Sequence, residues 1–120
     1  MKVEVETVDG ATIVRPQGRL DAITSPELGK VLTDLTAIES PRIVLDFSQS
    51  PFVSSAGLRV IVSAAKKTMG RGKLVLCGIS PLVKQVFDLA GLDRIMTICG
   101  TRDEAIEASQ GERGRQPPDV

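Results

Sequence analysis

A chain of 120 residues can bury one core of ordinary size, so we expect a single domain. Fifteen basic and fifteen acidic residues give a net charge of zero, which excludes a broad electrostatic surface for nucleic acid or an anionic membrane. Histidine is absent, which excludes Ser-His-Asp and Cys-His nucleophile activation and leaves zinc with few ligands. We therefore expect a protein that binds protein partners or small ligands, with no cofactor and no metal.

The N-terminal residues carry acids where a signal peptide would be apolar, and no apolar run approaches the ~18 residues of a membrane span. The expected location is the cytoplasm, with no membrane segment. Cys77 and Cys99 each end an apolar, strand-like run. We favour reduced, buried thiols over a structural disulfide at these positions.

The first elements predict a β-hairpin. Apolar and polar residues alternate over residues 2–8, Asp9-Gly10 is a tight-turn signal, and residues 11–15 form a second strand. The segment Pro16-Gln-Gly18 is expected to end that strand.

A first helix follows. Its start is indicated by Pro26 and by Thr24-x-x-Glu27 as a capping box, and Ser40-Pro41 stops it. Its apolar stripe is predicted to contain Leu28, Val31, Leu32, Leu35 and Ile38.

The next strand is the run Ile43-Val-Leu45, fully apolar as a strand buried on both faces should be. A second helix after residues 48–55 has its apolar residues at Leu58, Ile61, Val62, Ala65 and Met69. It leads through a glycine-rich turn into a strand over residues 73–77.

A third helix opens at Ser80-Pro81, and Gly91 caps its end. Its inner side is predicted to consist of Leu82, Val83, Val86, Phe87 and Ala90. A short strand over residues 95–98 and a last helix with the capping box Thr101-x-x-Glu104 follow. From Ser109 onward the composition is too polar to order itself, so residues 109–120 are predicted to be a disordered tail.

This element order predicts an α/β fold: a mixed, mostly parallel sheet with an N-terminal hairpin and about four helices. Sites in such sheets form beyond the carboxyl ends of the strands. Asp21 and residues 48–55 should converge there.

The serine pair Ser54-Ser55 stands where a strand gives way to a helix. Hydroxyls at a helix N-terminus suit capping, anion binding or phosphorylation alike. A hydrolase nucleophile elbow is excluded, because Val53 occupies the place of its first glycine and no histidine can act as base. Asp46 closes a strand like the phosphoacceptor of receiver domains, but paired acids for Mg²⁺ are missing, so we expect it to accept hydrogen bonds from loop N–H groups.

Four motifs in order resemble the STAS domain in its stand-alone form, the bacterial anti-sigma factor antagonist. They are Gly18-Arg-Leu-Asp21, Ile43-Val-Leu-Asp-Phe-Ser48, Val53-Ser-Ser-Ala-Gly-Leu-Arg59 and Val83-x-x-x-Phe87-x-x-x-Gly91-Leu92. The resemblance covers roughly residues 3–108, so we assign residues 1–108 to a STAS domain.

The resemblance implies a binding module and not an enzyme. Its unmodified form would bind an anti-sigma factor serine kinase of the histidine-kinase-like ATPase fold, phosphorylation of Ser55 would release that kinase, and a PP2C-type serine phosphatase would reset the switch. Many members carry Asp where this chain has Ser54, so Ser54 is the alternative acceptor, and the free protein should be a monomer. The partner surface is expected to contain Asp21, Ser48, Ser50, Ser54, Gly57 and Arg59.

Two other functions stay open at this point. One is a receiver-like phosphotransfer domain that uses Asp46. The other is a STAS interaction module that is not phosphorylated.

Overall fold

The first two strands form the predicted hairpin. In a computed structural model, which describes residues 1–110, β1 (Lys2–Val8) pairs antiparallel with β2 (Ala11–Gln17). The turn between them has φ of 51° at Asp9 and 81° at Gly10, the left-handed conformation that a tight hairpin requires.

One prediction about this hairpin is wrong, because β2 continues through Pro16 to Gln17. The neighbouring strand β3 (Arg42–Asp46) pairs with β2 only from Thr12 to Val14. Pro16 lies beyond that pairing, so its missing N–H costs the parallel ladder no hydrogen bond.

The sheet is mixed and mostly parallel, as predicted. It has five strands in the order β1-β2-β3-β4-β5, with β4 at Lys73–Cys77 and β5 at Thr97–Cys99. All pairs except β1 with β2 are parallel. The last strand begins two residues later than predicted, because Leu92–Arg94 form a turn of 3-10 helix (η1) and Met96 still donates to the carbonyl of Leu92.

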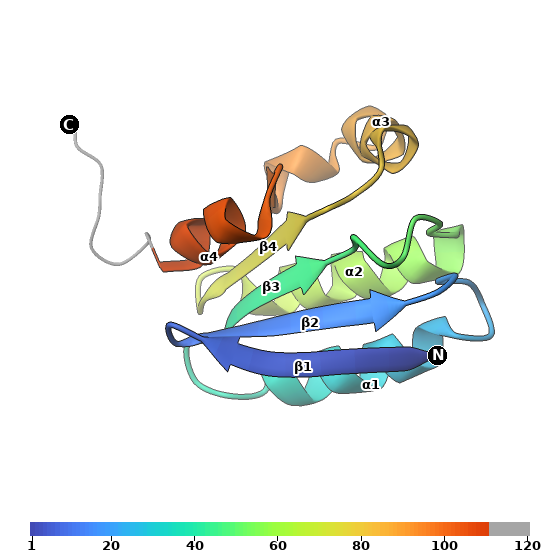
Figure 1. The fold of residues 1–120 in the computed structure, drawn as a ribbon. Coiled ribbons are helices and arrows are strands. Elements are labelled where there is room, and N and C mark those ends of the chain that lie inside the picture. Colours follow the sequence, from blue (N-terminus) through green and yellow to red (C-terminus); the bar gives the residue numbers. More distant parts are fainter. Residues whose placement is uncertain (111–120) are drawn as a thin grey trace.

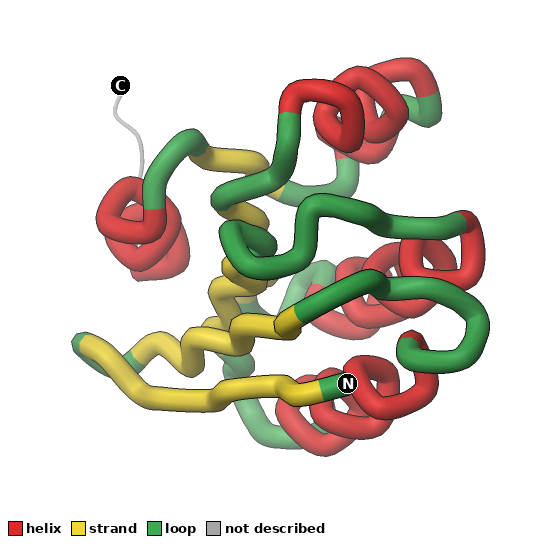
Figure 2. The backbone as a smooth tube through the Cα atoms, turned by 45° about the vertical axis from the view of Figure 1, so that its right-hand side comes forward, coloured by secondary structure: helices red, strands yellow, loops and turns green. Residues whose placement is uncertain are grey.

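Helices cover both faces of the sheet. Figures 1 and 2 show α1 (Ser25–Thr36) and α2 (Ser55–Thr68) on one face and α4 (Arg102–Gln110) on the other. Strand β3 alternates accordingly: Ile43 and Leu45 pack toward α1 and α2, and Val44 packs toward α4. The run of apolar residues in β3 is thus explained by burial on both sides.

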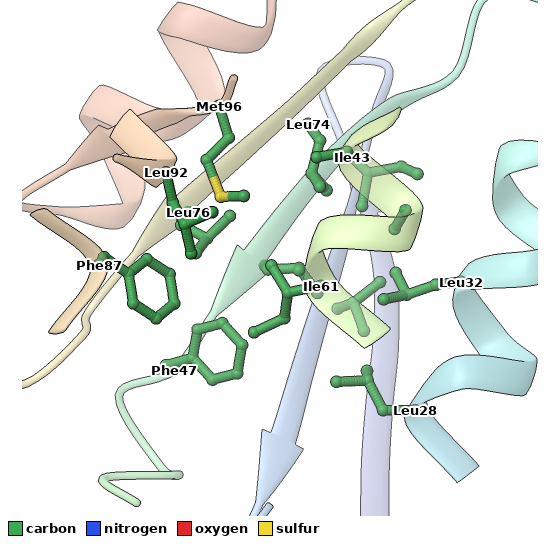
Figure 3. Packing of buried hydrophobic residues seen from close by; sticks show 14 of the residues in the cluster. Leu28, Leu32, Ile43, Phe47, Ile61, Leu74, Leu76, Phe87, Leu92 and Met96 are labelled. Atoms are coloured by element: carbon green, nitrogen blue, oxygen red, sulfur yellow. The ribbon is translucent and has the colours of Figure 1, made fainter. Parts of the chain in front are cut away.

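The larger core fills the space between the sheet, α1, α2 and α3 (Pro81–Leu89). In Figure 3, Phe47 at the end of β3 lies in the same packed layer as Ile61 of α2 and Phe87 of α3. These side chains are at most 1% exposed. The smaller core beneath α4 contains Ala11, Ile13, Val44, Val75, Cys77, Ala105 and Ile106.

Arg71 joins the ends of α1 and α2 at the amino-terminal edge of the parallel strands. Its guanidinium donates to the carbonyls of Thr36, Lys67 and Ile38, each at 2.8 Å. A cation at the negative end of two helix dipoles is favourable. The contact fixes the spacing of the two helices at the end farthest from the serine pair (Figure 1).

The predicted apolar stripes are only partly correct. Ile38 and Met69 are 51% and 57% exposed, because α1 and α2 end before them. In α3 only Val83 and Phe87 are buried, because this short helix meets the core along one narrow line. The three other residues that we expected on its inner side are exposed: Leu82, Val86 and Ala90.

The two predicted capping boxes have opposite outcomes. At α4, Glu104 N donates to the Thr101 hydroxyl and the Glu104 carboxylate accepts from Thr101 N, each at 3.2 Å, so that box is confirmed. At α1, Thr24 forms no side-chain cap. Its hydroxyl instead donates to the carbonyl of Arg19 and to Asp21.

The last helix runs further than predicted. Ser109 and Gln110, which we expected in the tail, form the end of α4, and Ser109 is 1% exposed. The rest of the predicted tail, 111–120, lies outside the described residues. Up to Gln110, none of the helices is long and apolar enough to cross a membrane.

Candidate functional site

Two loops are joined at the carboxyl ends of β2 and β3. Leu20 and Val53 form an isolated parallel bridge, in which Leu20 N donates to Phe52 O at 3.1 Å and Ser54 N donates to Leu20 O at 2.8 Å. Gly18 N also donates to Gln49 O at 2.9 Å. The predicted convergence of the segment around Asp21 with residues 48–55 is therefore confirmed, through backbone bonds.

The two serines differ in what their hydroxyls do. Ser54 is the N-cap of α2, with an extended backbone, and its hydroxyl accepts a hydrogen bond from Gly57 N at 3.3 Å. Ser55 is the first residue of α2 and is exposed. Within residues 1–110 no hydrogen bond of its hydroxyl is found, so of the two serines Ser55 is the more exposed and the one whose hydroxyl does not cap the helix.

Gly57 lets the start of α2 approach the bridge closely. A Cβ at this position would lie 2.7 Å and 2.8 Å from Leu20 Cγ and Cδ2 and 3.2 Å from the Leu20 carbonyl oxygen. Leu20 is fully buried and held by the bridge, so it has little room to move. Glycine at 57 is needed for this contact.

Asp21 shapes the loop before α1. Its Oδ1 accepts from Thr24 N and Ile23 N, each at 3.0 Å, and from the Thr24 hydroxyl at 3.1 Å. Hydrogen bonds from Thr24 and Ile23, with a smaller contribution from nearby Arg19, hold the pKa of Asp21 below its usual range. The carboxylate is therefore charged at neutral pH and tied to its own loop.

Asp46 anchors the loop that leads to the serines. Its Oδ1 accepts from Ser48 N at 2.9 Å, as predicted, and its Oδ2 accepts from Arg15 Nε at 3.3 Å. Burial alone would raise the pKa of Asp46, but the hydrogen bonds from Ser48 and the Arg15 guanidinium outweigh burial and lower the pKa. At 5% exposure, with both oxygens engaged, Asp46 is poorly placed to accept a phosphoryl group.

The expected partner residues fall into two groups. Ser48 and Arg59 are exposed, Asp21 and Ser54 are half-buried, and Arg59 lines a hollow of about 240 Å³ between α1 and α2. Ser50 and Gly57 are buried, which corrects their expected place on the partner surface. The Ser50 hydroxyl donates to the carbonyl of Gly18 at 2.6 Å, so it holds the two loops together.

An apolar rim that the sequence reasoning missed occupies this same end of the molecule. Its members are large exposed side chains, with 88% exposure at Ile23, 40% at Phe52, 71% at Leu82, 47% at Val86 and 85% at Leu89. The Ser80 hydroxyl at the start of α3 donates to Pro51 O at 3.5 Å, which places α3 beside the serine loop. Figure 1 shows the first turns of α1, α2 and α3 at this end.

The sequence did hold a sign of this rim, because the segment that forms α3 has more apolar residues than a core-facing stripe needs. A helix that needs only two residues for the core has other apolar residues left for solvent or a partner.

Phe52 of the rim is partly covered by Arg19, whose guanidinium lies 4.0 Å from the ring centroid.

The described part of the chain holds no group of three or more side chains that could bind a metal ion. The site thus offers an exposed hydroxyl, a helix N-terminus and an apolar rim. This combination suits recognition by another protein.

Comparisons with known proteins agree on one family. The model of the STAS domain matches residues 2–105. The chain is 33% identical over 109 residues to BtrV of Bordetella bronchiseptica, covering 90% of this chain and 94% of that protein. It is 31% identical over 100 residues to the anti-sigma F factor antagonist of Paenibacillus polymyxa, covering 82% and 86%.

Among solved structures, an anti-sigma factor antagonist from Mycobacterium paratuberculosis aligns with a TM-score of 0.83. It is 27% identical in sequence, and the alignment covers 91% of this chain and 93% of that one.

Gly57→Ala should lower the free energy of unfolding by about 1–3 kcal/mol, because the new methyl group overlaps Leu20. Urea denaturation measures the change. Gly29→Ala in α1 is the matched control: its Cβ would meet only Val60 methyl groups at 3.6 Å, so this variant should be neutral or gain up to about 1 kcal/mol. Equal effects of the two substitutions would contradict the close-approach argument.

Asp46→Asn should cost about 1–3 kcal/mol at neutral pH, because the charged bonds to Arg15 and Ser48 are weakened. The lowered pKa of Asp46 means that its stabilising contribution is complete above about pH 5 and is lost as the pH falls through and below ~4. Denaturation curves from pH 7 to acid should show the difference between the two proteins shrinking. A constant difference over that range would argue against the charge of Asp46 as the cause.

Proposed function

Because this chain belongs to the STAS domain family, as one of the anti-sigma factor antagonists, we propose that it is a switch controlled by phosphorylation of Ser55. Anti-sigma factor antagonists are regulators and not enzymes, and their partner is an anti-sigma factor. In the proposed circuit the unmodified protein binds an anti-sigma factor that is also a serine kinase. Phosphorylation ends that binding, and a phosphatase restores it.

The observation that carries this proposal is the contrast between the two serines. The hydroxyl of Ser54 accepts from Gly57 N, whereas Ser55 is exposed and its hydroxyl is unengaged in the described part of the chain. A kinase needs a hydroxyl that can enter its active site, and only Ser55 offers one without breaking the cap of α2. This supports Ser55 as the acceptor and Ser54 as the capping residue.

The position of Ser55 also decides what a phosphate would do to the domain. A phosphoserine carries about −1.5 to −2 charges near pH 7. At the first residue of α2 it meets the positive end of the helix dipole and unpaired backbone N–H groups, so the fold can accommodate it. The domain should therefore stay folded after modification.

A partner would experience the same phosphate differently. Near Ser55 the surface includes the exposed Arg59 and short polar side chains, and the apolar rim of Ile23, Phe52, Leu82, Val86 and Leu89 lies on neighbouring elements. Two added charges in an interface of this kind must be desolvated, which lowers affinity. A loss of about 3 kcal/mol already weakens binding more than a hundredfold, which is sufficient for partner exchange.

The proposed partners follow from the family. The kinase would have the histidine-kinase-like ATPase fold and the resetting enzyme would be a PP2C-type phosphatase, both in the cytoplasm. Asp21, Ser48, Ser54 and Arg59 remain proposed contact residues on the exposed side of the joined loops. Ser50 and Gly57 support that surface from below.

Incubation with the cognate kinase and ATP should label Ser55, as located by mass spectrometry of peptides. Ser55→Ala should remove the label and keep binding, and Ser55→Asp should weaken binding at least tenfold, because a charge then occupies the start of α2.

The matched control is Ser54→Ala, which should still be labelled while losing about 1 kcal/mol of stability through the missing cap. Phosphate found only on Ser54 would show that Ser54, and not Ser55, is the acceptor. No label on either serine would leave a binding module without a phosphorylation switch.

Leu82→Ser should weaken kinase binding at least tenfold if the apolar rim is part of the interface, because a large exposed apolar side chain is removed from the rim. Isothermal titration with the unmodified protein measures the affinity. Met69→Ser is the control, since Met69 is 57% exposed at the opposite end of the molecule. Affinity unchanged in Leu82→Ser, or reduced equally in both variants, would exclude the rim.

A further inference from the structure

The two cysteines of the chain lie opposite each other in the sheet. Cys77 ends β4 and Cys99 ends β5, and the two residues are direct register partners in this parallel pair. Neighbouring strands are about 4.7–4.9 Å apart, which falls within the range of about 4.4–6.8 Å between the Cα atoms of a disulfide. Register partners on neighbouring strands therefore have Cα atoms at a spacing seen in disulfides.

Their side chains also share one face. Cys77 belongs to the smaller core beneath α4, and Cys99 packs against that same core. The negative charge of a Cys99 thiolate contributes to raising the pKa of Cys77, as expected for two groups that are close together. Both cysteines are free thiols in this structure, so the reduced form is the one described.

The environments of the two thiols set an order of reaction. Cys77 is fully buried, and burial, with smaller contributions from Asp46 and Cys99, raises its pKa to about 12. Cys99 is only half-buried, and its pKa is raised by burial and by Glu104. Only the thiolate attacks a disulfide, so a reagent in solution should meet Cys99 first.

We propose that Cys77 and Cys99 form a reversible intramolecular disulfide by exchange with a small disulfide compound. Cys99 loses its proton, its sulfur attacks one sulfur of the compound, and a thiolate leaves. Cys77 then loses its proton and attacks the sulfur of Cys99, and the second thiolate leaves. The two protons end on the two released thiols, so two cysteines and one small disulfide give one protein disulfide and two small thiols.

This bond would belong to the labile class. Cβ atoms joined by a disulfide are about 3.5–4.5 Å apart, closer than the strand spacing, so the strands must be drawn together. Strand β5 has three residues and lies at the sheet edge with β4 as its neighbour, which makes it the part that can shift. Strained disulfides are readily reduced and are typically regulatory.

The bond would form next to the loop that presents Ser55. The carbonyl of Cys77 accepts from Phe47 N at 2.9 Å. A Cβ on the following Gly78, which has φ of 72°, would lie 2.8 Å from Ser48 N and 2.9 Å from Asp46 Oδ1. Cys77, one end of the proposed bond, thus lies directly beside the anchor of the serine loop, whether or not Ser55 is phosphorylated.

Treating the folded protein with 2-hydroxyethyl disulfide tests the proposal by intact mass spectrometry and non-reducing peptide mapping. The expected product has lost two hydrogen atoms, contains linked Cys77 and Cys99 peptides, forms at a rate independent of protein concentration, and reverts with dithiothreitol. Cys77→Ala should stop at a stable mixed disulfide on Cys99. Cys99→Ala should not react while folded.

Three results would overturn it. They are a stable mixed disulfide on Cys99 in the unsubstituted protein, a Cys77–Cys99 bond that forms only in urea, and disulfide-linked dimers as the main product. Thermal melting of both alanine variants establishes that they are folded under the conditions used.

Discussion

The backbone bridge between Leu20 and Val53 is the constraint on which the site depends. It holds the loop before α1 against the loop before α2, and the side chain of Leu20 then fills the space that the missing Cβ of Gly57 leaves open. Because the first turn of α2 rests on this contact, buried atoms set the position of Ser55 at the start of the helix. The Ser55 hydroxyl can therefore stay exposed without a hydrogen bond that holds it in place.

Around this bridge the two edges of the sheet have different chemistry. At the amino-terminal edge, Arg71 and Arg42 bind carbonyls at the ends of α1, α2 and α4. At the carboxyl edge the carboxylates of Asp21 and Asp46 accept hydrogen bonds from nearby loop N–H groups, and the outward-facing side chains are hydroxyls, apolar residues and the exposed arginines Arg19 and Arg59. A phosphate on Ser55 would add negative charge at the start of α2, with the exposed Arg59 four residues further along the same helix.

Much of this arrangement could be predicted from sequence, and the failures have specific causes. The hairpin, the order of strands and helices along the chain, the mostly parallel sheet and the serine at the start of α2 follow from turn chemistry, apolar runs and motif order. Periodicity could not show that α3 uses only Val83 and Phe87 for the core, because burial depends on how a helix meets its neighbours. Likewise, the bonds that bury Ser50 and engage Thr24 join residues whose proximity only the folded loops create.

The bridge has a consequence for newly made chains. Leu20 and Val53 are far apart in the sequence and meet beside the pairing of β2 with β3, so the bridge is a non-local contact whose formation costs loop-closure entropy. A chain that is partly folded or damaged in its sheet would carry the sequence around Ser55 without its helix cap and fixed approach. A kinase that recognises the shape of this junction would therefore act on completely folded domains and not on incomplete ones. Phosphorylation would then be confined to molecules that are able to bind the partner.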